Sequence, residues 1–496
     1  MALSSSSSSS YLPDRPPPLT ETQLQELRDH AVDWSLVNGL VLRPALASVN
    51  VTHAPFALFP SPFPRAAYEQ VVKLQPLFNS LVHAIAQDDK FIREIMEDLS
   101  KVDDFVEQVY EIYKAVSAEG STQPVTLGLH RSDYLLHVPS GAPSDFVPVP
   151  QQVELNTIAS SFSSLSSVVS ELHRFLAERT NYFNSPSLPT PDITVAGMPE
   201  NASRLGLPKA LAKAWQLYDN KDAVVVMVVQ PGERNAFDQR WIEYTLFKVH
   251  HIKLVRKTLA EIDSEGTLVG DERTLVIGKH EVAVTYFRSG YAPTDYPSGK
   301  GGAEWRARLL IERSKTIKCP NAAYHLVGTK KVQQILARPG VVERFLKNPV
   351  EAAQIRASFT GLYPLDSSAE GLEAVKLALS DPGRFVMKPQ REGGGNNIYG
   401  QDIAVALNKL TPKEREAFIL MDLIQPPRMQ NVMVRNAEII PSEVISELGI
   451  YGIWVSEGSV CHLNEAAGHL LRTKKSDSNE GGVAAGFAVI DSPLLL

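Results

Sequence analysis

The residues with the clearest chemical character lie in the segment 387–399, which contains three consecutive glycines followed by two asparagines. Glycine lets the backbone adopt positive φ and approach a ligand closely, so successive amide N–H groups can form a concave anion site. Lys388, Arg391 and Glu392 flank the glycines with two cations and one carboxylate. These groups could hold a polyphosphate together with its magnesium. Three glycines alone are also typical of a mobile surface loop, but the apolar residues 385–387 predict a strand that delivers Lys388 to the loop.

A second candidate site is the alternating segment Val153-Glu154-Leu155-Asn156. On a strand, the side chains of Glu154 and Asn156 project from the same face. Carboxylate and amide oxygens are hard ligands that suit Mg²⁺. The same alternation is typical of an exposed strand with one polar face, and the pattern alone leaves both interpretations open.

The C-terminal segment combines charged residues with a pair of glycines at 481–482. On a strand, Arg472 and Lys474 share one face. The polar run 475–479 predicts a mobile flap, and the glycine pair would let backbone amides approach a substrate. The apolar run 487–490 should pack as a strand, which argues against a disordered tail.

The hydrophobic pattern predicts the elements that must position these residues. Thr20 lies three residues before Gln23, which is the spacing of a capping box at the start of a helix. Further helical patterns run through 66–87, 90–117 and 164–179.

A different pattern begins at 223–229, which is apolar throughout, as expected for a strand buried on both faces. A helical stretch follows at 241–248, and further strands are expected at 252–255, 274–277 and 282–287. This order predicts a βαβ unit of about one hundred residues inserted between a helical part and the part with the glycine-rich segment.

Composition excludes several classes of protein. The chain has 496 residues, 44% of them hydrophobic, and a net charge of −7, which argues against a general binder of nucleic acid or anionic membranes. Its longest apolar run is far shorter than the roughly 20 residues of a membrane-spanning helix.

Cys319 and Cys461 show neither CxxC spacing nor a disulfide framework, which fits a reducing compartment and argues against zinc. The P-loop and the Rossmann glycine motif are absent from the sequence. We expect the Ser- and Pro-rich residues 1–18 to be a disordered tail, and the compartment to be the cytoplasm.

The sequence Lys-Pro-Gln-Arg-Glu-Gly-Gly-Gly-Asn-Asn at 388–397, with Tyr399 after it, resembles the glycine-rich loop of eukaryotic glutathione synthetases, which are ATP-grasp ligases. The resemblance extends from about Leu19 to the C-terminus. It implies an α/β (α+β) protein with an ATP-grasp fold, an inserted βαβ substrate-binding lid and a helical N-terminal part, assembled as a homodimer. The implied parts are the tail (1–18), an N-terminal part with the Glu154 motif (19–219), the lid (220–327) and a nucleotide-binding part (328–496).

The resemblance also implies which residues bind ATP and metal. Glu154, Asn156 and Glu392 would be ligands of two Mg²⁺ ions, and Lys330 and Lys388 would hold the phosphates. The implied ATP-binding residues are Glu154, Lys330, Lys388, Pro389, Gln390, Arg391, Glu392, Gly393, Gly394, Gly395, Asn396, Asn397, Tyr399, Met421, Asp422, Leu423, Ile424, Glu447, Lys474 and Glu480. Many relatives have Glu-Lys where this chain has Asp422 and Leu423, so a lysine hydrogen bond to the adenine is not expected here.

The donor substrate implied by the resemblance is γ-glutamylcysteine, and Arg131 is expected to clamp one of its carboxylates. The implied substrate residues are Arg131, Ile158, Ala159, Ser160, Ser161, Glu233, Arg234, Asn235, Gln239, Arg288, Ser289, Gly290, Tyr291, Arg472, Val483 and Ala484. Some relatives have serine at the position of Ala159, so one hydroxyl contact is expected to be absent.

The implied reaction passes through an acyl phosphate that glycine then attacks, with Lys330, Lys388 and Arg472 as catalytic groups. Related homoglutathione synthetases have Leu-Pro in place of Ala484-Ala485, so the sequence predicts glycine over β-alanine as acceptor. A homoglutathione synthetase, another ATP-grasp carboxylate–amine ligase and an ATP-binding module without ligase activity remain alternatives.

Overall fold

The computed structural model describes residues 11–13, 17–44, 49–180, 183, 194–390, 395–479, 481–483 and 486–496. Helices and strands are mixed along these residues, which confirms the predicted α/β class. Most of the tail expected at 1–18 lies outside the described residues. Among the described residues, every helix is too short or too polar to cross a membrane.

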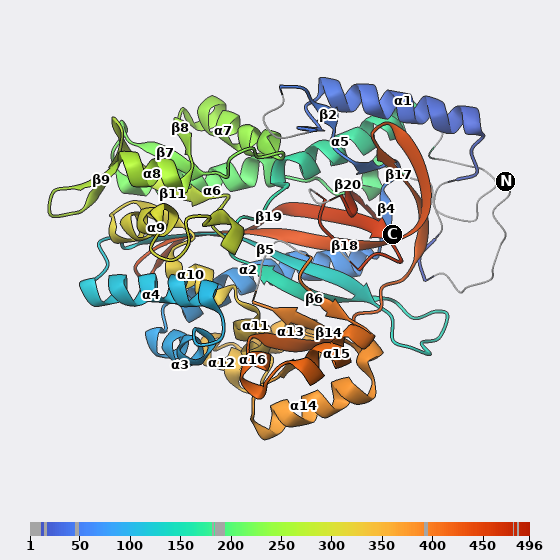
Figure 1. Ribbon diagram of the computed structural model, residues 1–496. Coiled ribbons are helices and arrows are strands. Elements are labelled where there is room, and N and C mark those ends of the chain that lie inside the picture. Colours follow the sequence, from blue (N-terminus) through green and yellow to red (C-terminus); the bar gives the residue numbers. More distant parts are fainter. Residues whose placement is uncertain are drawn as a thin grey trace.

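The central feature is a seven-stranded sheet with the order β17-β3-β20-β19-β18-β5-β6 (Figure 1). Its strands are β3 (Phe56–Ala57), β5 (Val125–His137), β6 (Val149–Asn156), β17 (Met429–Arg435), β18 (Glu438–Glu457), β19 (Val460–Lys475) and β20 (Ala488–Asp491). The β18–β19 hairpin pairs Glu447 with Arg472. On its other side β18 pairs with β5, and β5 pairs with β6 so that Arg131 lies opposite Asn156. Segments far apart in the sequence therefore bring polar residues to one part of this sheet.

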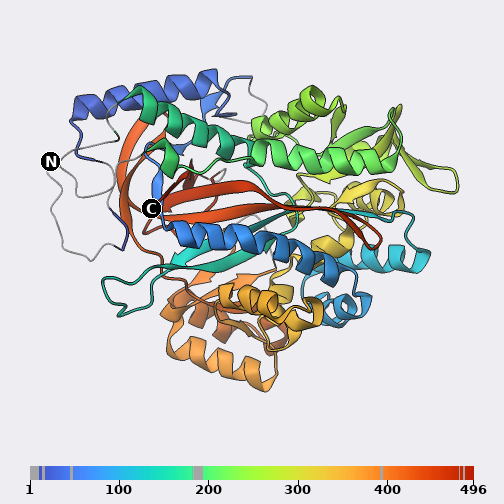
Figure 2. The ribbon, with the colours of Figure 1, turned by 180° about the vertical axis from the view of Figure 1, so that it is seen from behind.

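Two apolar clusters cover the opposite faces of the central sheet. Helix α2 (Arg65–Ala86) packs on one face, and Figure 2 shows it in blue, running alongside the long strands β18 and β19. Helices α5 (Ser163–Arg179) and α6 (Ser203–Tyr218) pack on the other face, against Leu127 and Leu129 of β5. Because side chains alternate along a strand, Arg131 and Asp133 share the face of Leu127 and Leu129.

A second sheet has the order β8-β7-β11-β10-β9, with β12 beside β11. Its elements are β7 (Val224–Val228), α7 (Ala236–His250), β8 (Leu254–Lys257), α8 (Leu259–Glu265), β9 (Gly266–Val269), β10 (Thr274–Ile277), β11 (His280–Phe287), α9 (Ala303–Arg313) and β12 (Ile317–Cys319). Strands β7, β8, β11 and β12 are parallel, and every residue of β7 is buried. The strands and the helix expected between residues 223 and 287 are therefore present, at similar bounds.

A third, four-stranded antiparallel sheet has the order β13-β16-β14-β15. Its elements are β13 (Leu362–Pro364), α14 (Ala369–Ser380), β14 (Phe385–Pro389), β15 (Ile398–Tyr399), α15 (Gln401–Lys409), α16 (Pro412–Arg415) and β16 (Phe418–Asp422). The glycine-rich segment joins β14 to β15, so the strand predicted to deliver Lys388 is present. Figure 1 shows this sheet and α14 on the opposite side of the central sheet from α1.

The remaining elements connect these three sheets. They are α1 (Glu21–Val37), β1 (Val41–Leu42), β2 (Thr52–His53), β4 (Ser61–Phe63), α3 (Asp89–Leu99), α4 (Asp104–Glu119), η1 (Val195–Gly197), η2 (Pro293–Asp295), α10 (Ala322–Val327), α11 (Lys330–Leu336), α12 (Val341–Phe345), α13 (Pro349–Ser358), η3 (Pro382–Arg384) and β21 (Pro493–Leu495). The predicted capping box of Thr20 and Gln23 is present at the start of α1.

The helix expected at 90–117 is instead two helices, α3 and α4. The carboxylate of Asp103 accepts hydrogen bonds from the backbone N–H groups of Phe105 and Val106, at 3.1 and 2.9 Å. This N-cap pairs two backbone N–H groups at the start of α4. It therefore starts a new helix inside the segment for which hydrophobic spacing alone predicts one continuous helix.

Replacing Asp103 tests the origin of this break. We expect Asp103→Ala to lower the free energy of unfolding by ~1–2 kcal/mol, because the buried cap is lost. Asp103→Asn is the matched control, since asparagine caps helices about as well as aspartate. Urea titration of both variants makes the comparison, and an alanine variant as stable as the asparagine variant would contradict the capping role.

Candidate active site

A cavity of about 1490 Å³, including its open mouth, lies between the central sheet and the four-stranded sheet. Twenty of the residues implied by the sequence line it. They are Arg131, Glu154, Asn156, Ile158, Ala159, Ser161, Tyr291, Lys330, Lys388, Asn396, Asn397, Tyr399, Met421, Asp422, Leu423, Ile424, Glu447, Arg472, Lys474 and Val483. The chain thus folds so that most of the separate sequence motifs converge on one cavity.

Other implied residues lie away from this lining or outside the described chain. Those not in the lining are Ser160, Glu233, Arg234, Asn235, Gln239, Arg288, Ser289, Gly290, Pro389, Gln390 and Gly395. Those outside the described residues are Arg391, Glu392, Gly393, Gly394, Glu480 and Ala484.

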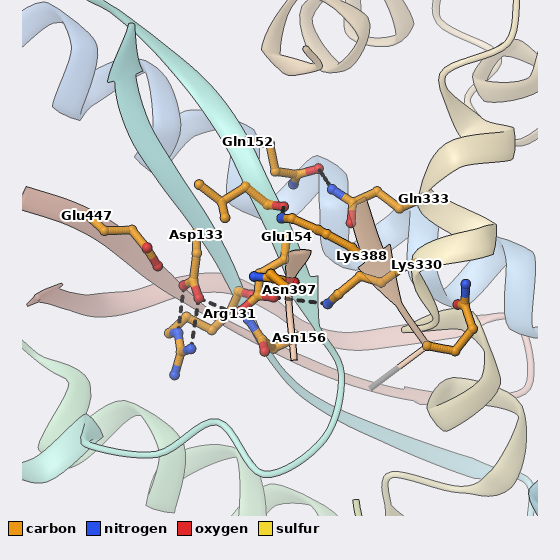
Figure 3. Close-up of polar contacts among 12 residues, drawn as sticks. Arg131, Asp133, Gln152, Glu154, Asn156, Lys330, Gln333, Lys388, Asn397 and Glu447 are labelled. Carbon is orange, nitrogen blue, oxygen red and sulfur yellow. Dashed lines mark hydrogen bonds and ion pairs between the residues drawn. The ribbon is translucent and has the colours of Figure 1, made fainter. Parts of the chain in front are cut away.

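Glu154 is surrounded by cations at the floor of the cavity. Lys330, the first residue of α11, donates from Nζ to Glu154 Oε2 at 2.9 Å (Figure 3). Lys388 of β14 donates from Nζ to the Val153 carbonyl at 3.0 Å. Burial would raise the pKa of Glu154, but the charges of Lys330, Lys388 and Arg472 outweigh it and hold this pKa well below its ordinary value. The carboxylate is therefore ionised at neutral pH, and the surrounding cations leave the region suited to a polyanion.

Asp133, which the sequence interpretation passed over, is the central acceptor of the site. Arg131 donates to both carboxylate oxygens, from Nε at 2.6 Å and from Nη2 at 2.8 Å. Arg472 Nη2 and Asn156 Nδ2 each donate to Asp133 Oδ2 at 3.0 Å. The carboxylate of Asp133 is fully buried, and Figure 3 shows Arg131 beside it. The signal was present in the sequence, because Asp133 follows Arg131 by two residues and so shares its strand face.

Nε and Nη2 of Arg131 thus both donate to Asp133, and the role of Arg131 as a clamp for a substrate carboxylate stays a prediction. Its remaining nitrogen, Nη1, donates to the Ser161 carbonyl at 3.4 Å. Arg472 also donates to Glu447, its partner across β18 and β19. Both arginines are therefore oriented by carboxylates of the protein itself.

Gly449 of β18 makes the close packing around Asp133 possible. A Cβ at this position would lie 2.5 Å from Asp133 Oδ1 and 2.8 Å from Arg131 Cδ. Any other residue would displace the buried ion pair.

The donor set around Glu154 fits magnesium. Asn156 Nδ2 donates to Asp133 and to the Arg131 carbonyl. The amide oxygen of Asn156, Oδ1, therefore points away from these two acceptors. Glu154 and Asn156 both line the cavity. Mg²⁺ commonly takes only one or two protein oxygens and completes its shell with phosphate and water. No group of three His, Cys, Asp or Glu side chains suited to a metal occurs among the described residues, which do not include Glu392.

A second group of residues in the cavity lining is largely aliphatic. It includes Leu135, Val153, Val386, Met421, Leu423 and Ile424. The carboxylate of Asp422, which also lines the cavity, accepts from Arg384 Nε and from the Tyr363 hydroxyl, each at 2.9 Å.

The segment after β6 has a strained backbone beside the cavity. Ala159 and Phe162 adopt left-handed conformations, with φ of 55° and 68°, which are unfavourable for residues with a side chain. The carboxylate of Asp238 on α7 stabilises this turn, because it accepts from the backbone N–H groups of Phe162, Ser164 and Leu165 at 2.8–3.3 Å. Arg288 Nη1 donates to the same carboxylate at 3.1 Å. Asp238 therefore connects Arg288 to Phe162, a residue of the cavity lining.

Two loops meet at the mouth of the cavity. The carbonyl of Asn479, in the predicted flap, accepts from the Tyr399 hydroxyl at 3.3 Å and from Lys474 Nζ at 3.0 Å. Gln390 instead supports α11, because its Oε1 accepts from the Lys331 N–H at 3.0 Å. Arg234 donates from Nε to the Arg43 carbonyl, on an exposed part of the surface.

Comparison with known proteins connects this cavity to one family. Residues 21–495 match the model of the eukaryotic glutathione synthase ATP-binding domain. The chain is 41% identical to the glutathione synthetase of Dictyostelium discoideum over 96% of its own length and 100% of that protein. It is 43% identical to the human glutathione synthetase, covering 95% and 97% of the two chains. The chloroplastic glutathione synthetase of Arabidopsis thaliana is 42% identical, with 96% and 86% coverage.

A solved structure has the same fold. The apo form of a glutathione synthetase-like effector from Globodera pallida superposes with a TM-score of 0.75 at 24% identity, over 97% of this chain and 98% of that one. The family match over nearly the whole chain and the identities of 41–43% agree with each other. The chain belongs to the eukaryotic glutathione synthase family.

Proposed function

We propose that the protein joins γ-L-glutamyl-L-cysteine to glycine at the expense of ATP, giving glutathione, ADP and phosphate. It is an ATP-dependent ligase of the glutathione synthetase type. The observation that carries the proposal is the convergence of Glu154, Lys330, Lys388 and Arg472 on one cavity, in a chain that matches these enzymes from end to end.

The first chemical step transfers a phosphoryl group. An oxygen of the cysteinyl carboxylate attacks the γ-phosphorus of ATP, the bond to the β-phosphate oxygen breaks, and ADP leaves. Lys330 and Lys388 hold the phosphates and stabilise the charge that develops on the transferring group. Glu154 and Asn156 would hold Mg²⁺, two ions in all with Glu392, and the metal when bound would neutralise phosphate charge.

The second step forms the peptide bond. The glycine amine attacks the acyl carbon, and the tetrahedral intermediate collapses with loss of phosphate and of the amine proton. Arg472, oriented by Asp133 and Glu447, stabilises negative charge on the acyl oxygen. Because water hydrolyses an acyl phosphate, the contact of the 475–479 flap with Tyr399 would serve to exclude solvent during this step.

The finer parts of the proposal concern the acceptor, the assembly and the compartment. Ala484-Ala485 favours glycine over β-alanine. A homodimer is supported by exposed apolar side chains on α7, namely Tyr244, Phe247 and Val249. Cys319 and Cys461 are free thiols, which is consistent with a location in the cytoplasm. Two plant relatives of the chain are chloroplastic enzymes.

The direct test is acceptor-dependent turnover. With ATP, Mg²⁺ and γ-glutamylcysteine, we expect glycine to give equal amounts of ADP and glutathione. β-Alanine should be used roughly 10- to 200-fold less efficiently, the usual range for one methylene. Chelation of divalent ions should stop ADP formation, and added Mg²⁺ should restore it. Nucleotide binding without acceptor-dependent turnover would refute the ligase.

The role of Asp133 gives a second prediction. In Asp133→Asn, a neutral amide would replace the carboxylate, so Arg131 and Arg472 would lose its negative charge and one of its two acceptor oxygens. We expect the free energy of unfolding to fall by ~3–5 kcal/mol. Displacement of Arg472 should lower kcat by roughly 10²-fold.

The matched control for this variant is Asp271→Asn, at an exposed turn between β9 and β10. This surface change should alter the free energy of unfolding by no more than ~0.5 kcal/mol. Chemical unfolding and steady-state kinetics measure both effects, and an Asp133→Asn enzyme with wild-type kcat would remove Asp133 from this role.

A further inference from the structure

Asp491, the last residue of β20, is a fully buried carboxyl group that the proposed mechanism does not use. Its neighbour Val489 belongs to the apolar cluster of α2, and the alternation of side chains places Asp491 on the same face of the central sheet. The same alternation places Thr473 of β19 on this face, whereas Arg472 and Lys474 project from the other face into the cavity. Asp491 therefore lies behind the strand that carries two cations of the cavity.

Hydrogen bonds connect this carboxyl group to three neighbouring strands. Asp491 Oδ2 lies 2.6 Å from Ser61 Oγ of β4 and 2.6 Å from Thr473 Oγ1 of β19. Thr473 Oγ1 in turn lies 2.7 Å from Ser446 Oγ of β18. The other carboxyl oxygen, Oδ1, accepts from the Ser492 N–H at 2.7 Å. The contact with Thr473 also joins β19 to β20, the two strands on either side of the flap at 475–479.

The hydroxyl groups of this cluster indicate where a proton on Asp491 would lie. Ser61 Oγ accepts from Asn431 Nδ2 at 3.0 Å, so the proton of Ser61 is available to Asp491 Oδ2. A neutral Asp491 can then donate to Thr473 Oγ1, and Thr473 can donate to Ser446. In this arrangement the hydroxyls of Ser61 and Thr473 each donate and accept one hydrogen bond.

The surroundings of Asp491 do not supply a positive charge to pair with a carboxylate. Its hydrogen-bond partners within the described ranges are all neutral. Arg472, Lys474 and Glu447 face the cavity, on the opposite side of the sheet. Burial of a carboxylate without a cation is costly, and it raises the pKa of Asp491 to about 7 although the hydrogen bonds lower it in part.

The titratable and charged groups on the other neighbouring elements have partners of their own. His173 of α5 contacts Ser492 Oγ at 2.7 Å, and burial lowers the pKa of His173 to about 4, so it is neutral at physiological pH. Arg435 of β17 and Arg65 of α2 donate to the backbone carbonyl groups of residues 488 and 495. Neutral Asp491 is thus the form that these surroundings favour.

We propose that Asp491, as a neutral carboxyl group, is a positioning residue for Arg472 and Lys474. It acts through Thr473, the residue between them, and fixes the end of β19 from behind the cavity. The inference rests on the proposed function, because these two cations are the ones assigned to the acyl centre and to ATP. Loss of the contact would displace the cations although Asp491 itself does not line the cavity.

The first experiment removes the contact from each side. We expect Asp491→Leu and Thr473→Val each to lower kcat for glutathione formation roughly 10- to 100-fold, because a small displacement of Arg472 is costly. KM for γ-glutamylcysteine should change by less than about threefold, since the lost interaction belongs to the transition state. The double variant should lose about as much as either single variant, because both remove the same contact. Asp491→Asn keeps a neutral hydrogen-bonding group and should retain kcat within about threefold of wild type.

Thr126→Val is the matched control for Thr473→Val. Its hydroxyl also lies 2.7 Å from a serine hydroxyl of β18, that of Ser456, but Thr126 is not in the cavity lining. This variant should keep kcat within about twofold of wild type. Thermal melting of every variant checks that it is folded.

The second experiment tests the neutral form and needs no turnover. An aspartate in the unfolded chain has a pKa of about 4. Because burial raises the pKa of Asp491 to about 7, unfolding releases its proton between these two values, and the wild type loses stability as pH rises through this window. Asp491→Asn cannot ionise. We therefore expect the Tm of Asp491→Asn minus that of the wild type to increase from about pH 5 to about pH 7 and then to level off.

Three results would overturn the inference. A Tm difference that does not change with pH would mean that Asp491 is ionised in the folded protein. Wild-type kcat in a folded Thr473→Val enzyme, or additive losses in the double variant, would mean that the contact does not position the cations. If Asp491→Leu does not fold, Thr473→Val and Asp491→Asn still decide between these outcomes. Failure of the wild-type enzyme to form glutathione would instead refute the proposed function, and the Tm comparison does not depend on it.

Discussion

The active site depends on one buried carboxylate, that of Asp133. Two arginines that face the same cavity repel each other, and removing either from water is costly unless it is paired. Asp133 accepts hydrogen bonds from both Arg131 and Arg472, and also from Asn156. It thereby holds Arg472, the proposed charge-stabilising cation, and Asn156, the proposed magnesium ligand, in fixed positions. These groups can act on a substrate without first being reorganised, which is the main source of electrostatic catalysis.

The fold provides this arrangement through strand register. β5 contributes Arg131 and Asp133, β6 contributes Glu154 and Asn156, and the β18–β19 hairpin contributes Glu447 and Arg472. Gly449 leaves the space that the buried ion pair fills. The two lysines proposed to hold the phosphates come from other elements, Lys330 from the start of α11 and Lys388 from β14. Rigid elements therefore hold the charged groups, while the loops at 475–479 and around Tyr399 meet at the mouth of the cavity.

The features that sequence predicts well are those encoded locally. The strand before the glycine-rich segment, the parallel strands from 223 onward and the capping box at Thr20 follow from short patterns, and all are present. The prediction of one continuous helix at 90–117 was wrong, because the hydrophobic spacing continues past Asp103, where a new helix begins. Gly449 was not identified, since its importance arises from the pairing of β5 with β18, which lies far away in the sequence. Asp133 was missed although it shares a strand face with Arg131. The role of Arg131 as a clamp for a substrate carboxylate stays a prediction from the family motif. Residues such as Glu392 and Ala484 lie outside the described chain and remain predictions from the family motif.

The central claim is that the cavity activates a carboxylate as an acyl phosphate. The most direct measurement uses γ-glutamylcysteine labelled with ¹⁸O in both oxygens of its cysteinyl carboxylate, with ATP, Mg²⁺ and glycine. Mass spectrometry of the products follows the label. The account predicts one ¹⁸O in each phosphate released, one in the new amide carbonyl of glutathione and none in ADP. Phosphate that carries no ¹⁸O, formed together with glutathione, would contradict an acyl phosphate and the mechanism built on it.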